Sequence, residues 1–127
     1  VPLASGLLTG KLTRETRFAD NDHRVFNRRG QYFDRGETFA GVDFKTGLEV
    51  VEELRPLIPA GATMAQFALR WILMFDAVST VIPGAKNPDQ AQANAAASDL
   101  APLPAETMAA LADLYEQRVK PLVHHYW

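Results

Sequence analysis

The sequence of 127 residues contains no cysteine, which excludes disulfide bonds, a thiolate nucleophile and a cysteine metal site. It also lacks an excess of charge of one sign, because 13 Lys and Arg residues stand against 15 Asp and Glu residues, for a formal net charge of −2. Such a balance gives no global field that would attract nucleic acid or anionic lipid. We therefore expect no nucleic acid and no membrane as partner, and the absence of cysteine fits a cytoplasmic location.

No apolar run is long enough to cross a bilayer, which takes about 20 apolar residues. The longest strongly apolar stretch, residues 67–75, is interrupted by Arg70, and the first residues lack the pattern of a signal peptide. Apolar residues make up 47% of the chain and charged residues 22%, which is an ordinary globular composition. The length suits one small domain or a piece of a larger one, and the start at Val1 indicates a segment of a longer protein.

Two helices are predicted in the middle of the chain. Residues 44–57 place their apolar side chains on one face, with glutamates on the other. A second helix begins after Thr63, which forms a capping box with Gln66. Its body, residues 64–75, is apolar on nearly every side, which predicts a helix enclosed between other layers.

Two more helices are predicted toward the C-terminus. Asn87 is a good N-cap and Pro88 suits the first helical position, so a third helix runs from there to about Ala97. A fourth follows Pro104, with an apolar face formed by Met108, Leu111, Leu114 and Tyr115.

Two short segments read as strands: the first residues of the chain and the β-branched run 77–82, which we expect to be buried. Residues 12–42 form an irregular connection far longer than the usual 4–6 residues. Two strands cannot make a stable sheet alone. The sequence therefore predicts a β–α–β–α segment of an α/β protein whose other strands lie elsewhere.

Residues 81–90 place a turn between the predicted strand and a helix start. Free backbone N–H groups and the positive end of the helix dipole favour an anion there, and Lys86 adds a cation. Gln90 and Asn94 are four residues apart, so they share one helix face and can both hydrogen-bond one flat ligand. The pattern fits a phosphate beside a purine, and it equally fits a plain turn with a solvated lysine and two surface amides.

Three separated motifs, in this order, resemble the C-terminal part of the aldo-keto reductases. They are residues 2–11 (PLASGLLTGK), residues 68–71 (ALRW), and residues 81–86 (VIPGAK) followed by Gln90 and Asn94. The ending, residues 118–127 (RVKPLVHHYW), resembles the bacterial NADP-dependent branch of that family. The resemblance covers essentially the whole chain.

This resemblance implies a (β/α)8 TIM barrel. Residues 1–127 would be the C-terminal portion of one barrel domain, namely strands 7 and 8 with their helices and the C-terminal helix, incomplete as a stand-alone barrel. Residues 12–42 would be a long loop on the cofactor and substrate side. A missing N-terminal half-barrel or self-association would then cover the open strand edges and apolar faces.

The resemblance also implies NADP(H) as cofactor and a small carbonyl substrate. The loop after the seventh strand would wrap the pyrophosphate, and the loop after the eighth would hold the 2′-phosphate and adenine. Lys86 favours NADP over NAD, because a 2′-phosphate needs a cation where a free hydroxyl does not. The cofactor-binding residues implied in this way are Leu3, Ser5, Gly6, Leu7, Lys11, Gly84, Ala85, Lys86, Gln90 and Asn94.

The family's catalytic Asp, Tyr, Lys and His have no match in this sequence. We therefore assign no catalytic residue and expect the chain alone to be inactive. It would be the NADP(H)-binding part of an oxidoreductase that transfers a hydride between NADPH and an aldehyde or ketone. The alternative is a non-catalytic oligomerising fragment with a vestigial nucleotide site.

No metal site is expected. His124 and His125 are adjacent and point apart on a helix, and His23 has no cysteine or histidine nearby in the sequence. Arg28 and Arg29 are diluted by neighbouring acids, which favours a solvated loop over an RNA-binding one.

Overall fold

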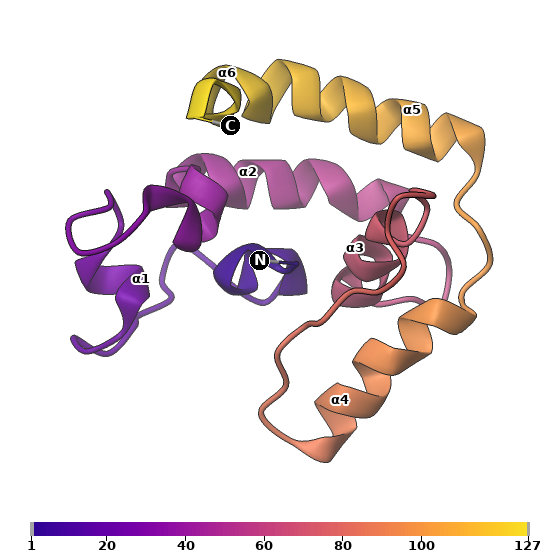
Figure 1. Cartoon of the computed structure of the whole chain (residues 1–127), viewed down its shortest axis with the longest axis horizontal. Helices are drawn as coiled ribbons and strands as arrows, with labels where there is room; N and C mark the ends of the chain where they lie inside the picture. Colours follow the sequence, from indigo (N-terminus) through magenta and orange to yellow (C-terminus); the bar gives the residue numbers. More distant parts are fainter. Residues whose placement is uncertain (1, 127) are drawn as a thin grey trace.

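The computed structural model describes residues 2–126, and within this range all regular secondary structure is helical (Figure 1). None of the helices in this range is long and apolar enough to cross a membrane. The α-helices are α1 (His23–Phe26), α2 (Phe44–Leu54), α3 (Met64–Ile72), α4 (Pro88–Ala95), α5 (Ala105–Leu114) and α6 (Lys120–Val123). The 3₁₀ turns are η1 (Ala4–Thr9), η2 (Arg35–Glu37), η3 (Phe39–Gly41), η4 (Arg55–Leu57), η5 (Ala96–Asp99) and η7 (His124–Tyr126), and η6 (Tyr115–Val119) is a π-helical turn.

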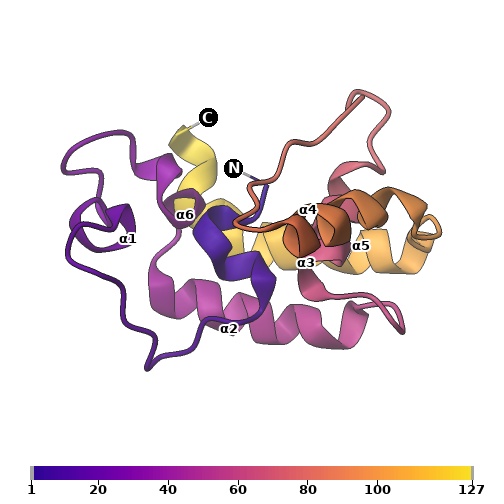
Figure 2. The same ribbon diagram turned by 90° about the horizontal axis from the view of Figure 1, so that it is seen from below.

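The C-terminal stretch from α5 to α6 lies along α2 (Figures 1 and 2). Arg118 joins the two through ion pairs with Glu49 at 3.2 Å and Glu53 at 3.1 Å. A core forms where η1, α2 and α3 meet, and α4 stands outside it at the end of an extended loop. The buried core residues are Leu7, Phe39, Val50, Val51, Leu54, Met64, Phe67 and Leu103.

The four predicted helices are confirmed as α2, α3, α4 and α5, and α3 and α4 begin with the predicted capping residues. The helix predicted over 44–57 is α2 followed by η4. Thr63 and Gln66 form the predicted capping box at the start of α3. Asn87 caps α4 by accepting a hydrogen bond from the Gln90 N–H at 2.9 Å. Such caps can be predicted from the sequence because the capping side chain accepts the backbone N–H of a residue only three positions further along the chain.

Both predicted strands are wrong for this structure. Residues 4–9 form the turn η1, Val1 lies outside the described residues, and residues 77–82 carry no strand. The expected burial of this run also fails, because Ile82 is 84% exposed. A strand needs a neighbour to pair with its N–H and C=O groups, and nothing within residues 2–126 provides one.

The expectation that the second helix is enclosed on nearly every side is also wrong. One side of α3 is buried through Phe67, Ala68 and Leu69, but Trp71 and the following Phe75 are exposed and pack edge-on against each other at 5.0 Å between ring centroids. The apolar pattern was typical of a helix packed on a sheet, and the described residues form no sheet.

A glycine in α2 lets η1 approach closely. A Cβ atom added at Gly47 would lie 2.6 Å from Leu7 Cδ1, closer than non-bonded carbon atoms approach in folded proteins. Because Leu7 is 4% exposed and packed in the core, it has little room to move away. The absence of a side chain at Gly47 therefore sets how deeply η1 is buried.

We expect Gly47→Ala to lower the free energy of unfolding by about 1 kcal/mol. Alanine raises helix propensity by about 1 kcal/mol, but overpacking a core costs about 1–3 kcal/mol, and the second effect dominates here. Denaturant unfolding followed by circular dichroism measures the difference. Gly84→Ala is the matched control, because nothing lies within 4 Å of its added Cβ, and it should change stability by less than about 0.5 kcal/mol. A stabilising Gly47→Ala would contradict the close approach.

Candidate functional site

The turn that begins η1 has left-handed backbone at three successive residues. The φ angles are +46° at Ala4, +55° at Ser5 and +97° at Gly6. Only glycine adopts this region without strain, so the two residues before it must be held by their surroundings. The turn directs Leu7 into the core and leaves Ser5 and Gly6 half-buried beneath the long loop 12–42.

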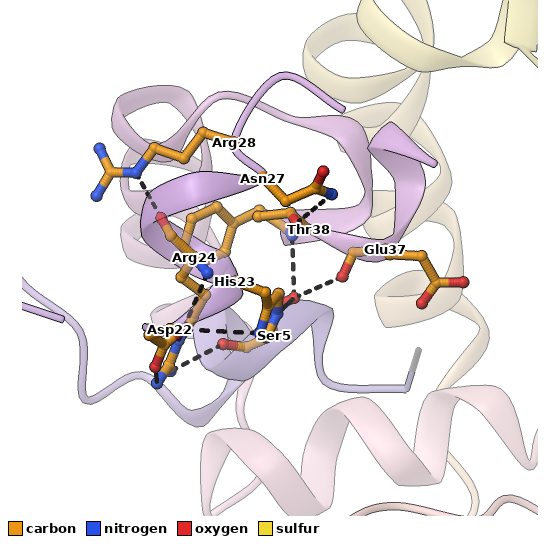
Figure 3. A network of polar contacts seen from close by, with 9 residues as sticks. Ser5, Asp22, His23, Arg24, Asn27, Arg28, Glu37 and Thr38 are labelled. Carbon is orange, nitrogen blue, oxygen red and sulfur yellow. Dashed lines mark hydrogen bonds and ion pairs between the residues drawn. The ribbon is translucent and has the colours of Figure 1, made fainter. Parts of the chain in front are cut away.

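The Ser5 hydroxyl ties this turn to the long loop (Figure 3). It donates to the Glu37 carbonyl at 3.1 Å and accepts the Phe39 N–H at 3.1 Å. His23 Nε2 lies 3.5 Å from the same oxygen. The structure thus assigns the Ser5 side chain to holding loop and turn together, and His23, which the sequence leaves as a lone loop residue, lies against it.

Arg24 lies against the same turn. Its Nη1 donates to the Ser5 carbonyl at 3.3 Å, and its guanidinium stacks 4.2 Å from the Phe18 ring centre. Asp22 fixes it through two hydrogen bonds, from Nε at 2.9 Å and from Nη2 at 2.6 Å. These hydrogen bonds hold the pKa of the Asp22 carboxyl at about 2. Asp22 thereby occupies the Nε–Nη2 fork and pairs the charge of the guanidinium, which leaves one N–H on each of Nη1 and Nη2 without a hydrogen bond to residues 2–126.

A buried asparagine orders the rest of the loop. Asn27 donates to Thr38 Oγ1 at 3.2 Å and accepts the N–H groups of Tyr32 and Phe33 at 3.0 and 3.1 Å. The connection predicted to be irregular contains the short helix α1 and the turns η2 and η3, and it is internally bonded. The pairing of Arg24 with Asp22, the N-cap of α1, is local in sequence, but no sequence signal indicates that Arg24 reaches Ser5 or that Asn27 reaches Thr38, because the fold of the loop brings these residues together.

The second predicted region, residues 84–94, lies on the surface. Gln90 and Asn94 share a face of α4, as expected, and both amides hold the preceding bend. Gln90 Oε1 accepts the Lys86 N–H at 2.9 Å, and Asn94 Nδ2 donates to the Gly84 carbonyl at 3.2 Å. Each amide keeps one further group, Gln90 Nε2 and Asn94 Oδ1, that forms no hydrogen bond with residues 2–126.

The two predicted regions are not joined by any hydrogen bond or ion pair within the part of the chain that is described. Residues 3–11 bond to the long loop and to Arg55, whereas residues 84–94 bond among themselves and to Gln66 of α3. Leu7 is buried and could offer a ligand only its backbone, and Lys11 and Lys86 are exposed. No group of three or more His, Asp or Glu residues in the range 2–126 is placed to hold a metal ion.

Comparison with known proteins identifies a family. Residues 1–116 match the model of the aldo/keto reductase family. The chain is 34% identical over 107 residues to a probable voltage-gated potassium channel subunit beta of Arabidopsis thaliana, covering 80% of this chain and 29% of that protein. The chain therefore spans less than a third of the length of this curated relative. No solved structure matches it.

We expect Asp22→Asn to lower the free energy of unfolding at pH 7 by about 1 kcal/mol. The fall in pKa from 3.8 to about 2 corresponds to about 2 kcal/mol at 1.36 kcal/mol per unit, and solvent screening of this partly exposed pair reduces it. Because the folded-state pKa is depressed, the contribution is complete above about pH 4 and disappears as the pH falls through 2. The gap between wild type and variant should close over that window in thermal unfolding scans.

The control for this change is Asp20→Asn, which alters an exposed carboxylate in the same loop. It should leave stability at pH 7 within about 0.5 kcal/mol of wild type. An Asp22→Asn variant whose deficit persists unchanged at pH 2 would show that Asp22 contributes by another route.

Proposed function

The chain belongs to the aldo/keto reductase family, and we propose that it is the NADP(H)-binding C-terminal part of a carbonyl reductase. The observation that carries this proposal is the Arg24 guanidinium, which Asp22 holds against the left-handed Ser5–Gly6 turn. The family resemblance assigns that turn to the cofactor pyrophosphate. The N–H that Nη1 and Nη2 each keep would be donated to the diphosphate, and charge-assisted hydrogen bonds are about twice as strong as neutral ones.

The turn itself suits close approach by a phosphate. Gly6 has no side chain, and a Cβ atom added there would come within 3.5 Å of Arg24 Nη1. That is an ordinary contact distance, so it is the φ of +97° that disfavours a side chain at this position. Leu3, Ser5 and Gly6 would face the pyrophosphate in this proposal, with the backbone of Leu7 and the exposed Lys11 beside them.

The bend 84–94 would bind the adenosine end. Adenine presents an amino donor next to a ring-nitrogen acceptor, the pair that Asn and Gln side chains recognise. Asn94 Oδ1 and Gln90 Nε2 offer the complementary acceptor and donor. Lys86 would pair with the 2′-phosphate. The backbone of Gly84 and Ala85 would lie close to the nucleotide, since nothing lies within 4 Å of a Cβ added at Gly84 and the space there is open.

The chemistry of the parent reaction would be hydride transfer between the nicotinamide of NADPH and a small aldehyde or ketone. The residues of this chain would bind and orient the cofactor. The family's catalytic Asp, Tyr, Lys and His have no counterpart here, so the missing N-terminal half-barrel would supply the proton donor. The chain alone should therefore not oxidise NADPH in the presence of a carbonyl compound.

A second candidate function is a non-catalytic, self-associating fragment with a vestigial nucleotide site. It is favoured by the hydrogen bonds that already engage Gln90 and Asn94 with the bend. Binding of NADPH, NADH and 2′,5′-ADP by the chain together with the N-terminal half of the family's barrel distinguishes the two. Absence of binding by the restored protein would favour this second function.

In the restored protein, we expect Lys86→Glu to weaken NADPH binding by about 10- to 100-fold, since a charged hydrogen bond contributes about 1.5–3 kcal/mol. NADH binding should change less than about twofold, because NADH lacks the 2′-phosphate. Arg24→Gln should weaken both nucleotides alike, because both carry the pyrophosphate. Isothermal titration calorimetry measures all four affinities.

Lys45→Glu is the matched control, since Lys45 is an exposed residue of α2 outside both regions, and it should leave both affinities unchanged. Equal losses of NADPH and NADH in Lys86→Glu would contradict the role assigned to this lysine. A normal affinity for both nucleotides in Arg24→Gln would contradict the pyrophosphate site.

A further inference from the structure

One histidine faces the turn that we propose as the pyrophosphate site. His23 is the first residue of α1, directly after the N-cap Asp22, and its Nε2 lies 3.5 Å from the Ser5 hydroxyl oxygen (Figure 3). This distance is longer than the usual hydrogen bond of about 2.7–3.2 Å. The hydroxyl also donates to the Glu37 carbonyl and accepts the Phe39 N–H. The contact between His23 and Ser5 is therefore weak, and Nε2 keeps the capacity to donate to a ligand.

Asp22, His23 and Ser5 have the composition of the acid, base and nucleophile of a serine hydrolase, but not its hydrogen bonding. A nucleophilic hydroxyl must give its proton to the base, whereas the Ser5 hydroxyl donates to the Glu37 carbonyl at 3.1 Å. The histidine at this turn therefore does not activate Ser5 and is available for another interaction.

Two charged groups lie beside the imidazole of His23. Asp22 Oδ1 is 3.6 Å from Nδ1, and Asp22 is the one acidic residue within ion-pair distance of the ring among residues 2–126. Arg24 is held on the same carboxylate, so Asp22 attracts a proton on the ring and Arg24 repels it. The turn contributes the Ser5 hydroxyl, and the loop contributes the Phe33 ring at 6.4 Å between ring centres, neither of which is charged. The His23 side chain is 40% exposed, so protons reach it from solvent.

The charge beside the turn depends on the protonation of this histidine. The charges of Asp22 and Arg24 cancel, so the three side chains together carry no net charge when His23 is neutral and one positive charge when it is protonated. Histidine is the residue type that ordinarily changes charge between about pH 5 and pH 8. Asp22 stays ionised over this range because its pKa is held at about 2, and an arginine side chain stays protonated.

We propose that protonated His23 is a further phosphate-binding residue of this turn and donates from Nε2 to the cofactor diphosphate beside Arg24. This inference rests on the proposed function, because it requires the diphosphate to lie on the turn at Ser5 and Gly6. The diphosphate is negatively charged and favours the protonated imidazole. Nucleotide affinity therefore rises as the pH falls through the range in which histidine titrates, and binding takes up protons.

Isothermal titration calorimetry of the restored protein with NAD⁺ tests the proposal. NAD⁺ is the probe because its diphosphate keeps its charge over this range, whereas a phosphate monoester such as the 2′-phosphate of NADP⁺ titrates at about pH 6. We expect the dissociation constant to be about fivefold lower at about pH 5.5 than at about pH 7.5, a modest change because the site is partly exposed. Titrations in buffers of different ionisation enthalpy should show proton uptake near the middle of this range.

Two substitutions separate the charge of His23 from a structural role. His23→Gln should bind NAD⁺ at both pH values about as wild type does at about pH 7.5, because it never carries the charge. His23→Lys should bind at both pH values about as wild type does at about pH 5.5, because its charge is permanent over this range. A purely structural histidine would instead make both variants weaker at both pH values.

His125→Gln is the matched control, because His125 is an exposed histidine of η7 at the other end of the chain. It should keep the pH dependence of the wild type. Far-ultraviolet circular dichroism of each variant should show unchanged helix content, since His23 and His125 are not buried.

The outcomes distinguish this inference from the proposed function. NAD⁺ binding without pH dependence or proton uptake would overturn the role of His23 and leave the proposed function standing. A pH dependence that persists in His23→Gln would also overturn it, because another group would then take up the proton. A restored protein that binds neither NAD⁺ nor NADPH at any pH would overturn the proposed function and this inference together.

Discussion

The left-handed turn at residues 4–6 is the constraint on which the rest of the structure depends. Ala4 and Ser5 adopt positive φ angles, and the resulting turn brings Leu7 into the core. Gly47 leaves room for Leu7 there because it has no side chain. The same turn presents the Ser5 hydroxyl to the long loop, which closes over η1 through Glu37 and Phe39. The packing of Leu7 and the hydrogen bonds of Ser5 together hold Ala4 and Ser5 at positive φ angles, which are unfavourable for residues other than glycine.

Charge is arranged in local pairs rather than in one field. Asp22 fixes Arg24 over the turn, and Arg118 joins the C-terminal stretch to Glu49 and Glu53 of α2. The first pair is the more enclosed of the two, and it holds the guanidinium against the turn at Ser5 and Gly6 that we propose as the pyrophosphate site. Pairs of this kind contribute modestly to stability. They also hold a guanidinium in one place, and a hydrogen bond from a guanidinium to a phosphate depends on that placement.

The same fold leaves the proposed adenosine region and the exposed segment 77–85 on the outside. Gln90 and Asn94 stabilise their own bend, and Gln90 keeps the donor Nε2 and Asn94 the acceptor Oδ1 for a ligand. The segment before them is uncharged and forms no strand pairing, because the sheet that its composition favours does not form within residues 2–126. The composition of residues 77–82 favours a strand, but residues 2–126 form no sheet with which this segment could pair.

The sequence by itself determined the features whose cause lies within a few residues. The capping box at Thr63, the N-cap at Asn87, the face shared by Gln90 and Asn94, and the family motifs could all be predicted, because each depends on neighbours along the chain. Only the tertiary structure decided that residues 77–82 stay unpaired, that Ser5 binds the loop rather than standing free, and that Arg24 lies on the turn. Strand pairing, burial of Asn27 and the placing of Arg24 each require residues distant in sequence to meet, and no local pattern specifies such a meeting.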